Sequence, residues 1–154
     1  MEVPPVLLSA IVCDRVIFDK ISGMPSLINI IQTINVTNYP VRSGQIVFFC
    51  ELTNGHGKTK TKVKIVNAQE DDKAVFEQEG MLQFNDVKQV VTLAVTMQGI
   101  VFPVQGEYRF QLFADDYLLG ERRLICRKFE LPPKNEPGMA ESLHINPRYM
   151  AAFA

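Results

Sequence analysis

The stretch FPVQGEYRFQLFADDYLLGERRLIC, residues 102–126, decides the fold class of this chain. From Tyr108 to Asp115, apolar and polar side chains mostly alternate, which is typical of a strand that is buried on one face. The following Ala-Asp-Asp-Tyr favours a turn, because Asp tolerates turn geometry and caps its own backbone. We therefore predict a β-hairpin whose second strand runs from Leu118 to Cys126.

The start of this hairpin predicts one specific contact. Gly106-Glu107-Tyr108 is similar to the tyrosine corner of Greek-key sandwiches, in which a Tyr at the start of a late strand bonds back to the neighbouring connection. We expect Tyr108, Phe110 and Leu112 to belong to the core.

Working outward, turn signals separate further segments with the composition of strands. We predict strands over residues 6–13, 26–36, 45–53, 58–66, 74–84 and 90–97. Asn54-Gly55-His56-Gly57 predicts a hairpin turn between two of them. No helical period is found in the body of the chain. The prediction is an all-β fold of about eight strands at sandwich-like spacing.

Composition bounds the domain organisation and the partners. The 154 residues are 47% hydrophobic and 21% charged, which indicates one globular domain. Residues 132–138 are rich in helix and strand breakers, so we predict a domain over residues 1–131 and a linker with an irregular C-terminal tail over 132–154. A formal net charge of −1 gives the molecule as a whole no attraction to nucleic acid or to an anionic membrane, and leaves a local charged patch open.

The cysteines and the N-terminus indicate a cytoplasmic protein. Cys13, Cys50 and Cys126 stand singly, without the paired spacing of a metal site, and their odd number suggests reduced thiols. Met1-Glu2 carries an acid where a signal peptide has its positive region. No apolar run reaches the ~18 residues that cross a bilayer.

Several short motifs together resemble a bacterial family that is known only as a domain of unknown function. They are Cys13–Asp19, Ser22-Gly23, Ser26–Ile30, Tyr39-Pro40, Phe102-Pro103, Gly106–Phe110 and Leu118–Gly120. The resemblance covers roughly residues 6–130 and implies a single antiparallel β-sandwich, immunoglobulin-like or C2-like, without an assigned activity. The extended C-terminal tail departs from the family pattern.

The sequence does not predict an enzyme. Nucleophilic catalysis uses a Cys or Ser with a His and an orienting acid, and the two histidines, His56 and His144, occur in no such motif. Sugar binding has little support, since the chain has no Trp and its loop tyrosines, Tyr39 and Tyr117, stand alone. We expect no catalytic residue, no cofactor and no metal.

Two charged patterns leave ligand binding open as an alternative function. Lys58, Lys60, Lys62 and Lys64 alternate on one strand and could bind an anion or phosphate, although a solvated face opposite Glu77 and Glu79 is the favoured interpretation. The acid pairs Asp71-Asp72 and Asp115-Asp116 could hold calcium if they meet at one end of the domain. Turn formation is the favoured role of these acids.

Exposed apolar residues favour protein binding as the function. Val47 and Phe49 lie on the predicted outer face of a strand, and Tyr149 and Phe153 belong to the apolar tail. Intradomain packing is the alternative for each. We expect a non-enzymatic module that binds another protein or itself, with these four residues as the candidate interface.

Overall fold

The computed structural model describes residues 3–129, and every regular element in that range is a β-strand. The strands are β1 (Val6–Phe18), β2 (Pro25–Ile30), β3 (Thr33–Val36), β4 (Val41–Arg42), β5 (Gln45–Thr53), β6 (Gly57–Asn67), β7 (Lys73–Phe84), β8 (Val91–Gln98), β9 (Val101–Phe102), β10 (Gly106–Ala114) and β11 (Tyr117–Lys128). The all-β prediction is confirmed, although this range holds eleven strands rather than about eight.

Two sequence predictions concern residues outside the described range. The predicted domain boundary after residue 131 and the tail over 132–154 lie outside it. Within residues 3–129, no helix is long and apolar enough to cross a membrane.

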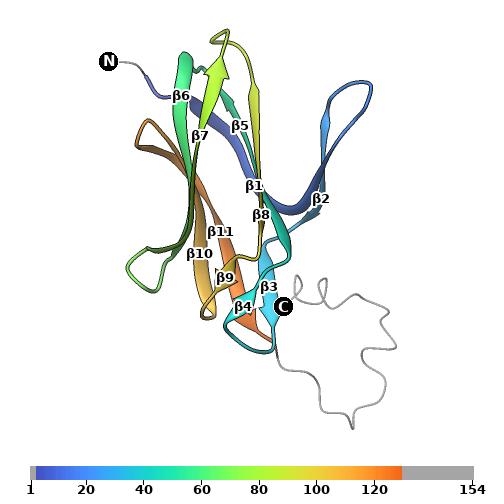
Figure 1. The fold of residues 1–154 in the computed structure, drawn as a ribbon, viewed down its shortest axis with the longest axis vertical. Helices are drawn as coiled ribbons and strands as arrows, with labels where there is room; N and C mark the ends of the chain where they lie inside the picture. Colours follow the sequence, from blue (N-terminus) through green and yellow to red (C-terminus); the bar gives the residue numbers. More distant parts are fainter. Residues whose placement is uncertain (1–2, 130–154) are drawn as a thin grey trace.

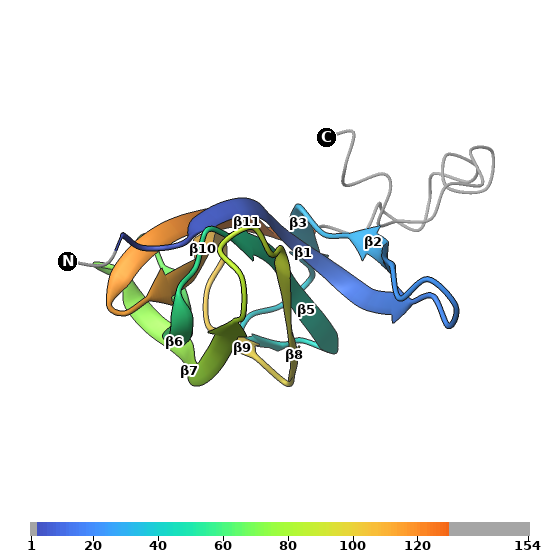
Figure 2. The ribbon, with the colours of Figure 1, turned by 90° about the horizontal axis from the view of Figure 1, so that it is seen from above.

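The strands form two larger sheets and one small one. The four-stranded sheet has the order β2-β1-β5-β8, the five-stranded sheet has the order β3-β11-β10-β6-β7, and β4 pairs with β9. Figure 1 shows the strands along the long axis of the molecule. Figure 2, from above, shows β6, β7, β10 and β11 on one side and β5 and β8 on the other. The two larger sheets therefore face each other, with inward side chains between them.

One apolar core fills the space between these sheets. The rings of Phe48 on β5 and Phe110 on β10 meet edge to face, with their centroids 5.6 Å apart, and both are fully buried. Full burial of a side chain of this size contributes roughly 1.5–3 kcal/mol. The core residues are Val12, Ile46, Phe48, Cys50, Leu52, Val63, Ile65, Phe84, Val95, Met97, Ile100, Phe102, Tyr108, Phe110, Leu112, Leu124 and Cys126.

The predicted hairpin is confirmed as β10 and β11, which pair antiparallel. Asp115 and Asp116 form its turn with φ angles of 47° and 71°, which are typical of a two-residue hairpin loop. The buried hydroxyl of Tyr108 donates to the carbonyl oxygen of Val104 at 2.7 Å. The predicted tyrosine corner is therefore confirmed.

The strand predicted over residues 26–36 is instead two strands that belong to different sheets. β2 pairs antiparallel with β1, whereas β3 pairs with β11 in parallel, so the prediction of a wholly antiparallel fold is wrong at this pair. The N–H of Ile31 donates to the carbonyl oxygen of Val12 at 2.8 Å, and the N–H of Ile125 donates to that of Gln32 at 3.2 Å. The crossing segment is thus bonded to both sheets.

The turn predicted at residues 54–57 does not close a hairpin. It joins β5 to β6, and these strands lie in different sheets. The ring of Phe84, which belongs to the core, packs directly against Gly55. The connection therefore passes from one sheet to the other over a packed aromatic ring.

Candidate functional site

β1 extends beyond the part of it that pairs with β5. Its first half pairs with β5 as far as Cys13, and its second half pairs with β2. We call residues 14–30 the arm. Figures 1 and 2 both show the arm projecting from the body of the molecule. Among the described strands only β1 pairs with β2, so the arm is a two-stranded hairpin.

A hydrogen-bonded turn holds the tip of the arm. Oδ1 of Asp19 accepts the N–H of Ile21 at 2.9 Å and the N–H of Ser22 at 2.7 Å. The Asp19 N–H donates to the carbonyl oxygen of Met24, and the Asp19 carbonyl oxygen accepts the N–H of Gly23. The backbone hydrogen bonds from Ser22 and Ile21 lower the pKa of Asp19. The turn therefore presents its apolar residues from a fixed backbone.

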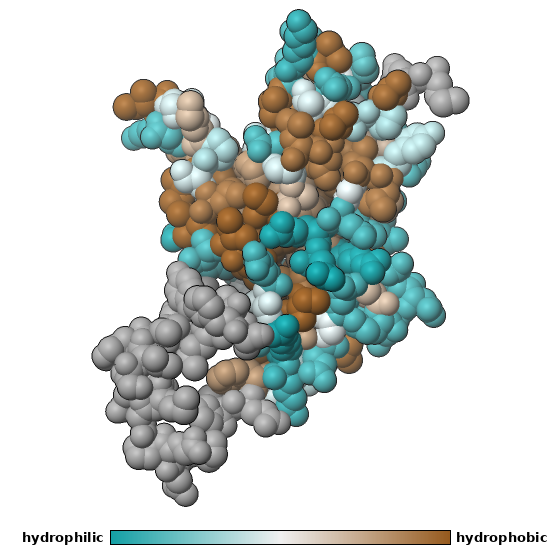
Figure 3. All heavy atoms as spheres, turned by 180° about the vertical axis from the view of Figure 1, so that it is seen from behind, coloured by the Kyte–Doolittle hydropathy of each residue, from teal (hydrophilic) through white to brown (hydrophobic). Residues whose placement is uncertain are grey.

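The arm carries apolar side chains on both faces. Strand register places Ile17 and Ile30 on one face and Phe18 and Leu27 on the other. The exposed fractions are 49% for Ile17, 51% for Phe18, 98% for Ile21, 68% for Met24 and 52% for Ile30. Figure 3 shows brown, apolar atoms on the arm and on the adjoining face of the body. An exposed group of this kind is typical of a protein-binding surface.

Val47 and Phe49 do not form the exposed strand face that the sequence predicted. β5 lies between β1 and β8 and is buried on both of its faces. The exposed fractions of Val47 and Phe49 are 2% and 3%. Side chains this deeply buried offer no area to a partner, so this part of the predicted interface is corrected. Tyr149 and Phe153 lie outside the described residues.

Sequence reasoning did not single out the exposed apolar residues of the arm. A signal was present, because Val16, Ile17 and Phe18 are consecutive apolar residues and therefore lie on both faces of one strand. The sequence does not reveal that the second half of β1 has a single neighbouring strand. Because this half of β1 lacks a second neighbouring strand, its apolar side chains are exposed.

The lysine strand forms a solvated face, as predicted. Lys60 pairs with Glu79 at 3.6 Å and Lys62 pairs with Glu77 at 3.4 Å, while the side chains between the lysines are buried. Lys62 also lies 5.5 Å from the centroid of the Phe113 ring. Two of the four charges are therefore paired. The first and last lysines of the series have no ion pair with a described residue.

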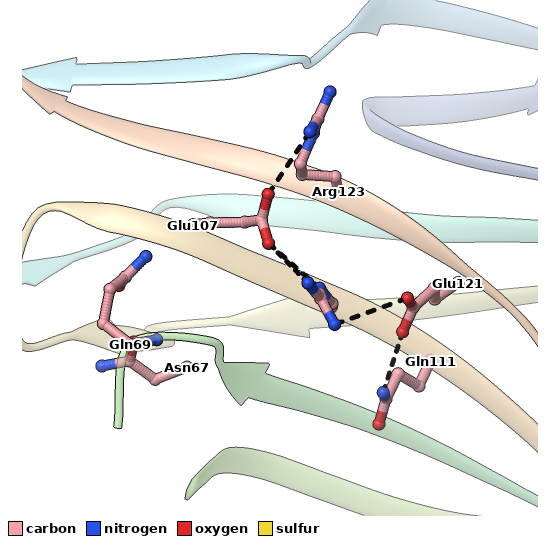
Figure 4. Close-up of polar contacts among 7 residues, drawn as sticks. Asn67, Gln69, Glu107, Gln111, Glu121 and Arg123 are labelled. Atoms are coloured by element: carbon pink, nitrogen blue, oxygen red, sulfur yellow. Dashed lines mark hydrogen bonds and ion pairs between the residues drawn. The ribbon is translucent and has the colours of Figure 1, made fainter. Parts of the chain in front are cut away.

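A network of charged side chains covers the outer face of β10 and β11 (Figure 4). Glu107 accepts hydrogen bonds from Arg109 at 2.9 and 3.0 Å, and pairs with Arg123 at 3.4 Å. Arg109 also lies 3.8 Å from Glu121, which accepts a hydrogen bond from Gln111 at 2.9 Å. The hydrogen bond to Glu107 raises the pKa of Arg109. The negative charges of the two acids balance the positive charges of the two arginines. The contacts between these side chains link β10 to β11.

The two acid pairs lie at opposite ends of the five-stranded sheet. Asp115-Asp116 follows the residue of β10 that pairs with Thr61, whereas Asp71-Asp72 comes after Asn67 at the other end of β6. Thr61 and Asn67 are six positions apart on the strand, which is about 20 Å. One calcium ion cannot contact both pairs. Residues 3–129 hold no group of three or more His, Cys, Asp or Glu side chains suited to a metal.

The cysteines are buried thiols. Burial raises the pKa of Cys50 and of Cys126 to about 12, and it also raises the pKa of Cys13. A thiol with so high a pKa is not a nucleophile at neutral pH, because the thiolate is the reactive form. The geometry therefore places no activated cysteine within the described part of the chain.

Of the remaining sequence candidates, His56 and Tyr117 line one small hollow together with Asp115. His56 is exposed in the β5–β6 connection, and His144 lies outside the described range. Tyr39 donates its hydroxyl proton to the carbonyl oxygen of Arg127 at 2.8 Å, so its polar end is already bonded. Tyr117 is 57% exposed at the start of β11. The structure does not bring these side chains together with the arm.

Known proteins offer a comparison for this arrangement. A family model described as "Family of unknown function (DUF6941)" matches residues 8–127. The chain belongs to this family. The match spans the arm and the β10–β11 hairpin, and it confirms the resemblance found in the sequence. No curated protein matches the chain.

One similar solved structure is that of a glycosyl hydrolase family 2 member from Bacteroides cellulosilyticus. It is 13% identical with a TM-score of 0.38, and the match covers 66% of this chain and 17% of that one. The chain thus spans less than a fifth of the length of that hydrolase. A likeness of this size assigns no activity.

Proposed function

We propose that this DUF6941 chain is a non-enzymatic interaction module that binds another protein, or a second copy of itself, through the arm. The supporting observation is the exposure of Ile17, Phe18, Ile21, Met24 and Ile30 on a hairpin made by β1 and β2.

The stability of an isolated hairpin supports this proposal. Two strands alone are at best marginally stable in water. A partner that covers one face of the arm removes apolar area from water, at roughly 25 cal/mol per Å². The bonded turn at Asp19 lowers the entropy lost on binding, because the backbone is already ordered.

The charge of the arm is compatible with a second copy as the partner. Asp14 and Asp19 are balanced by Arg15 and Lys20. An isologous contact brings the same surface together twice, and a surface of mixed charge does not repel itself.

We extend the proposal to the architecture of the domain and to the cellular compartment of the protein. We infer that the two larger sheets form a β-sandwich of the immunoglobulin-like or C2-like kind, which the shared core and the Tyr108 corner support. Three free, buried thiols support a reducing, cytoplasmic compartment.

The test compares the wild type with a double variant of the arm, Phe18→Ser with Ile21→Ser. The matched control is Met81→Ser, which changes a side chain that is 62% exposed on β7, away from the arm. Sedimentation over a wide concentration range measures self-association. Equal melting temperatures establish that all three proteins are folded.

Association that is kept in the control and lost in the arm variant supports self-binding. Cross-linking in a native extract tests binding to another protein: the partner should be recovered with the wild type and the control, but not with the arm variant. A monomeric wild type that recovers the same proteins as the arm variant overturns the proposal.

A further inference from the structure

An open edge of β11 borders a hollow at the base of the arm. β3 pairs with β11 only from Ile125 onward, and the described strands provide no other partner on that side. The hollow is lined by Gln32, Thr33, Arg122, Arg123 and Ile125. We call it the β11 hollow. Gln32 follows the last residue of β2 by two positions, so the hollow adjoins the arm.

Hydrogen-bond donors dominate the lining of the β11 hollow. Two guanidinium groups carry five N–H donors each, and an amide and a hydroxyl add three more. Among residues 3–129, no carboxylate lines it. The hollow therefore has an excess of positive charge and of donors.

The charge of Arg122 is not neutralised within the described residues. Arg122 is half-buried and takes part in none of the ion pairs of residues 3–129. Arg123 pairs with Glu107 at 3.4 Å, and Glu107 also pairs with Arg109. The side chain of Arg123 is 70% exposed. Its fork keeps N–H groups that do not face Glu107.

The backbone contributes a further donor. The N–H of Ile125 points away from β10, since it donates to Gln32 of the crossing segment at 3.2 Å. N–H directions alternate along a strand, so the N–H of Arg123 points to the same side, where none of the described strands pairs with it. Arg122 and Arg123 are consecutive on β11 and leave opposite faces of the strand, and both border the hollow at its open edge.

We propose that the β11 hollow binds a phosphate group, free or carried by a small molecule. Guanidinium forks match the spacing of phosphate oxygens and bind them in pairs. A phosphate at neutral pH is negatively charged. It therefore balances the positive charge of Arg122 and the part of the Arg123 charge that Glu107 does not neutralise. This site is separate from the lysine strand and does not depend on the function proposed for the arm.

The test is a titration of the isotope-labelled full-length chain with inorganic phosphate, with chloride holding the ionic strength constant. We expect saturable shifts of the backbone amide signals of Arg123 and Thr33. Replacing both arginines, Arg122→Gln with Arg123→Gln, should weaken phosphate binding about tenfold or more, because charge-assisted pairs are lost.

The matched control also removes two positive charges, Lys58→Gln with Lys64→Gln, and should change the affinity by less than about twofold. Arg122→Lys keeps the charge but loses the fork, and should weaken binding several-fold without loss of folding. Shifts that do not saturate, or equal losses in the arginine and lysine variants, overturn the site.

Discussion

The hydroxyl of Tyr108 is bonded twice to one residue, since it donates to the carbonyl oxygen of Val104 at 2.7 Å and accepts the Val104 N–H at 3.3 Å. The Phe102 ring packs edge to face against the Tyr108 ring at 4.9 Å between centroids. One side chain therefore fixes the connection that leads into β10.

Tyr108→Phe should lower the free energy of unfolding by about 1 kcal/mol or somewhat more, because two backbone groups lose a buried partner. Urea denaturation measures the change. Tyr117→Phe is the matched control, since Tyr117 is 57% exposed, and it should be neutral. Equal stability of the Tyr108 variant and the wild type contradicts the structural role of the corner.

Gly106→Ala should be more damaging than an ordinary glycine substitution. Gly106 has a φ of 136°, and a Cβ atom there would overlap with the side chain of Gln69. A backbone conformation at so large a positive φ is sparsely populated by L-residues and costs them roughly 1–3 kcal/mol. Gly44→Ala, at a position with nothing within 4 Å of a new Cβ, should leave the melting temperature nearly unchanged. Similar melting temperatures for the two variants would refute this expectation.

Asp19→Ala should loosen the arm without unfolding the body. The variant loses the two hydrogen bonds that Asp19 accepts, and β2 pairs only with β1 among the described strands. Hydrogen exchange should quicken at residues 14–30 while the global melting temperature changes little. Asp86→Ala removes the acceptor for the N–H of Lys88 and should affect only its own loop.

Acid should have the same local effect as the Asp19 substitution. A lowered pKa means that the carboxylate stabilises the turn above its unfolded pKa, and that this contribution is lost as pH falls through the folded value. Protection factors at the arm, which compare the measured exchange rate with that of an unstructured chain at the same pH, should therefore fall at low pH in the wild type but not further in Asp19→Ala. An equal response in both proteins contradicts the assignment.

The buried thiols should destabilise the fold at alkaline pH. The pKa of Cys50 and Cys126 is raised from 9.0 to about 12 in the folded chain, so their contribution is complete below about pH 9 and is lost between about pH 9 and 12. In Cys50→Ala the free energy of unfolding should fall less steeply over this pH range. The same variant should be less stable at neutral pH, because it leaves a cavity. Iodoacetamide should modify the native thiols slowly at neutral pH and the unfolded chain fast.

Local patterns account for the parts of the fold that the sequence could predict. The β10–β11 hairpin depends on alternation and on Asp115-Asp116, all within one short segment. The partners of Lys60 and Lys62 were predictable because β6 and β7 are consecutive and their register follows from the turn.

Sheet assignment was not predictable in the same way. β5 and β6 are consecutive but lie in different sheets, and no local signal at Asn54-Gly55 distinguishes a hairpin from a crossing connection. The burial of Val47 and Phe49 depends on which strands flank β5, and the exposure of Phe18 depends on the lack of a second neighbour. Both are properties of the assembled sheets.

The parallel pairing of β3 with β11 has a consequence for the order in which the chain folds. Thr33 lies opposite Ile125, so β3 has no partner strand until almost all of the described chain has been synthesised. The β1–β2 arm, by contrast, needs only residues that are close in sequence. Non-local strand pairs slow folding. We therefore expect slow maturation, during which the apolar residues of the arm are exposed before the two larger sheets have formed.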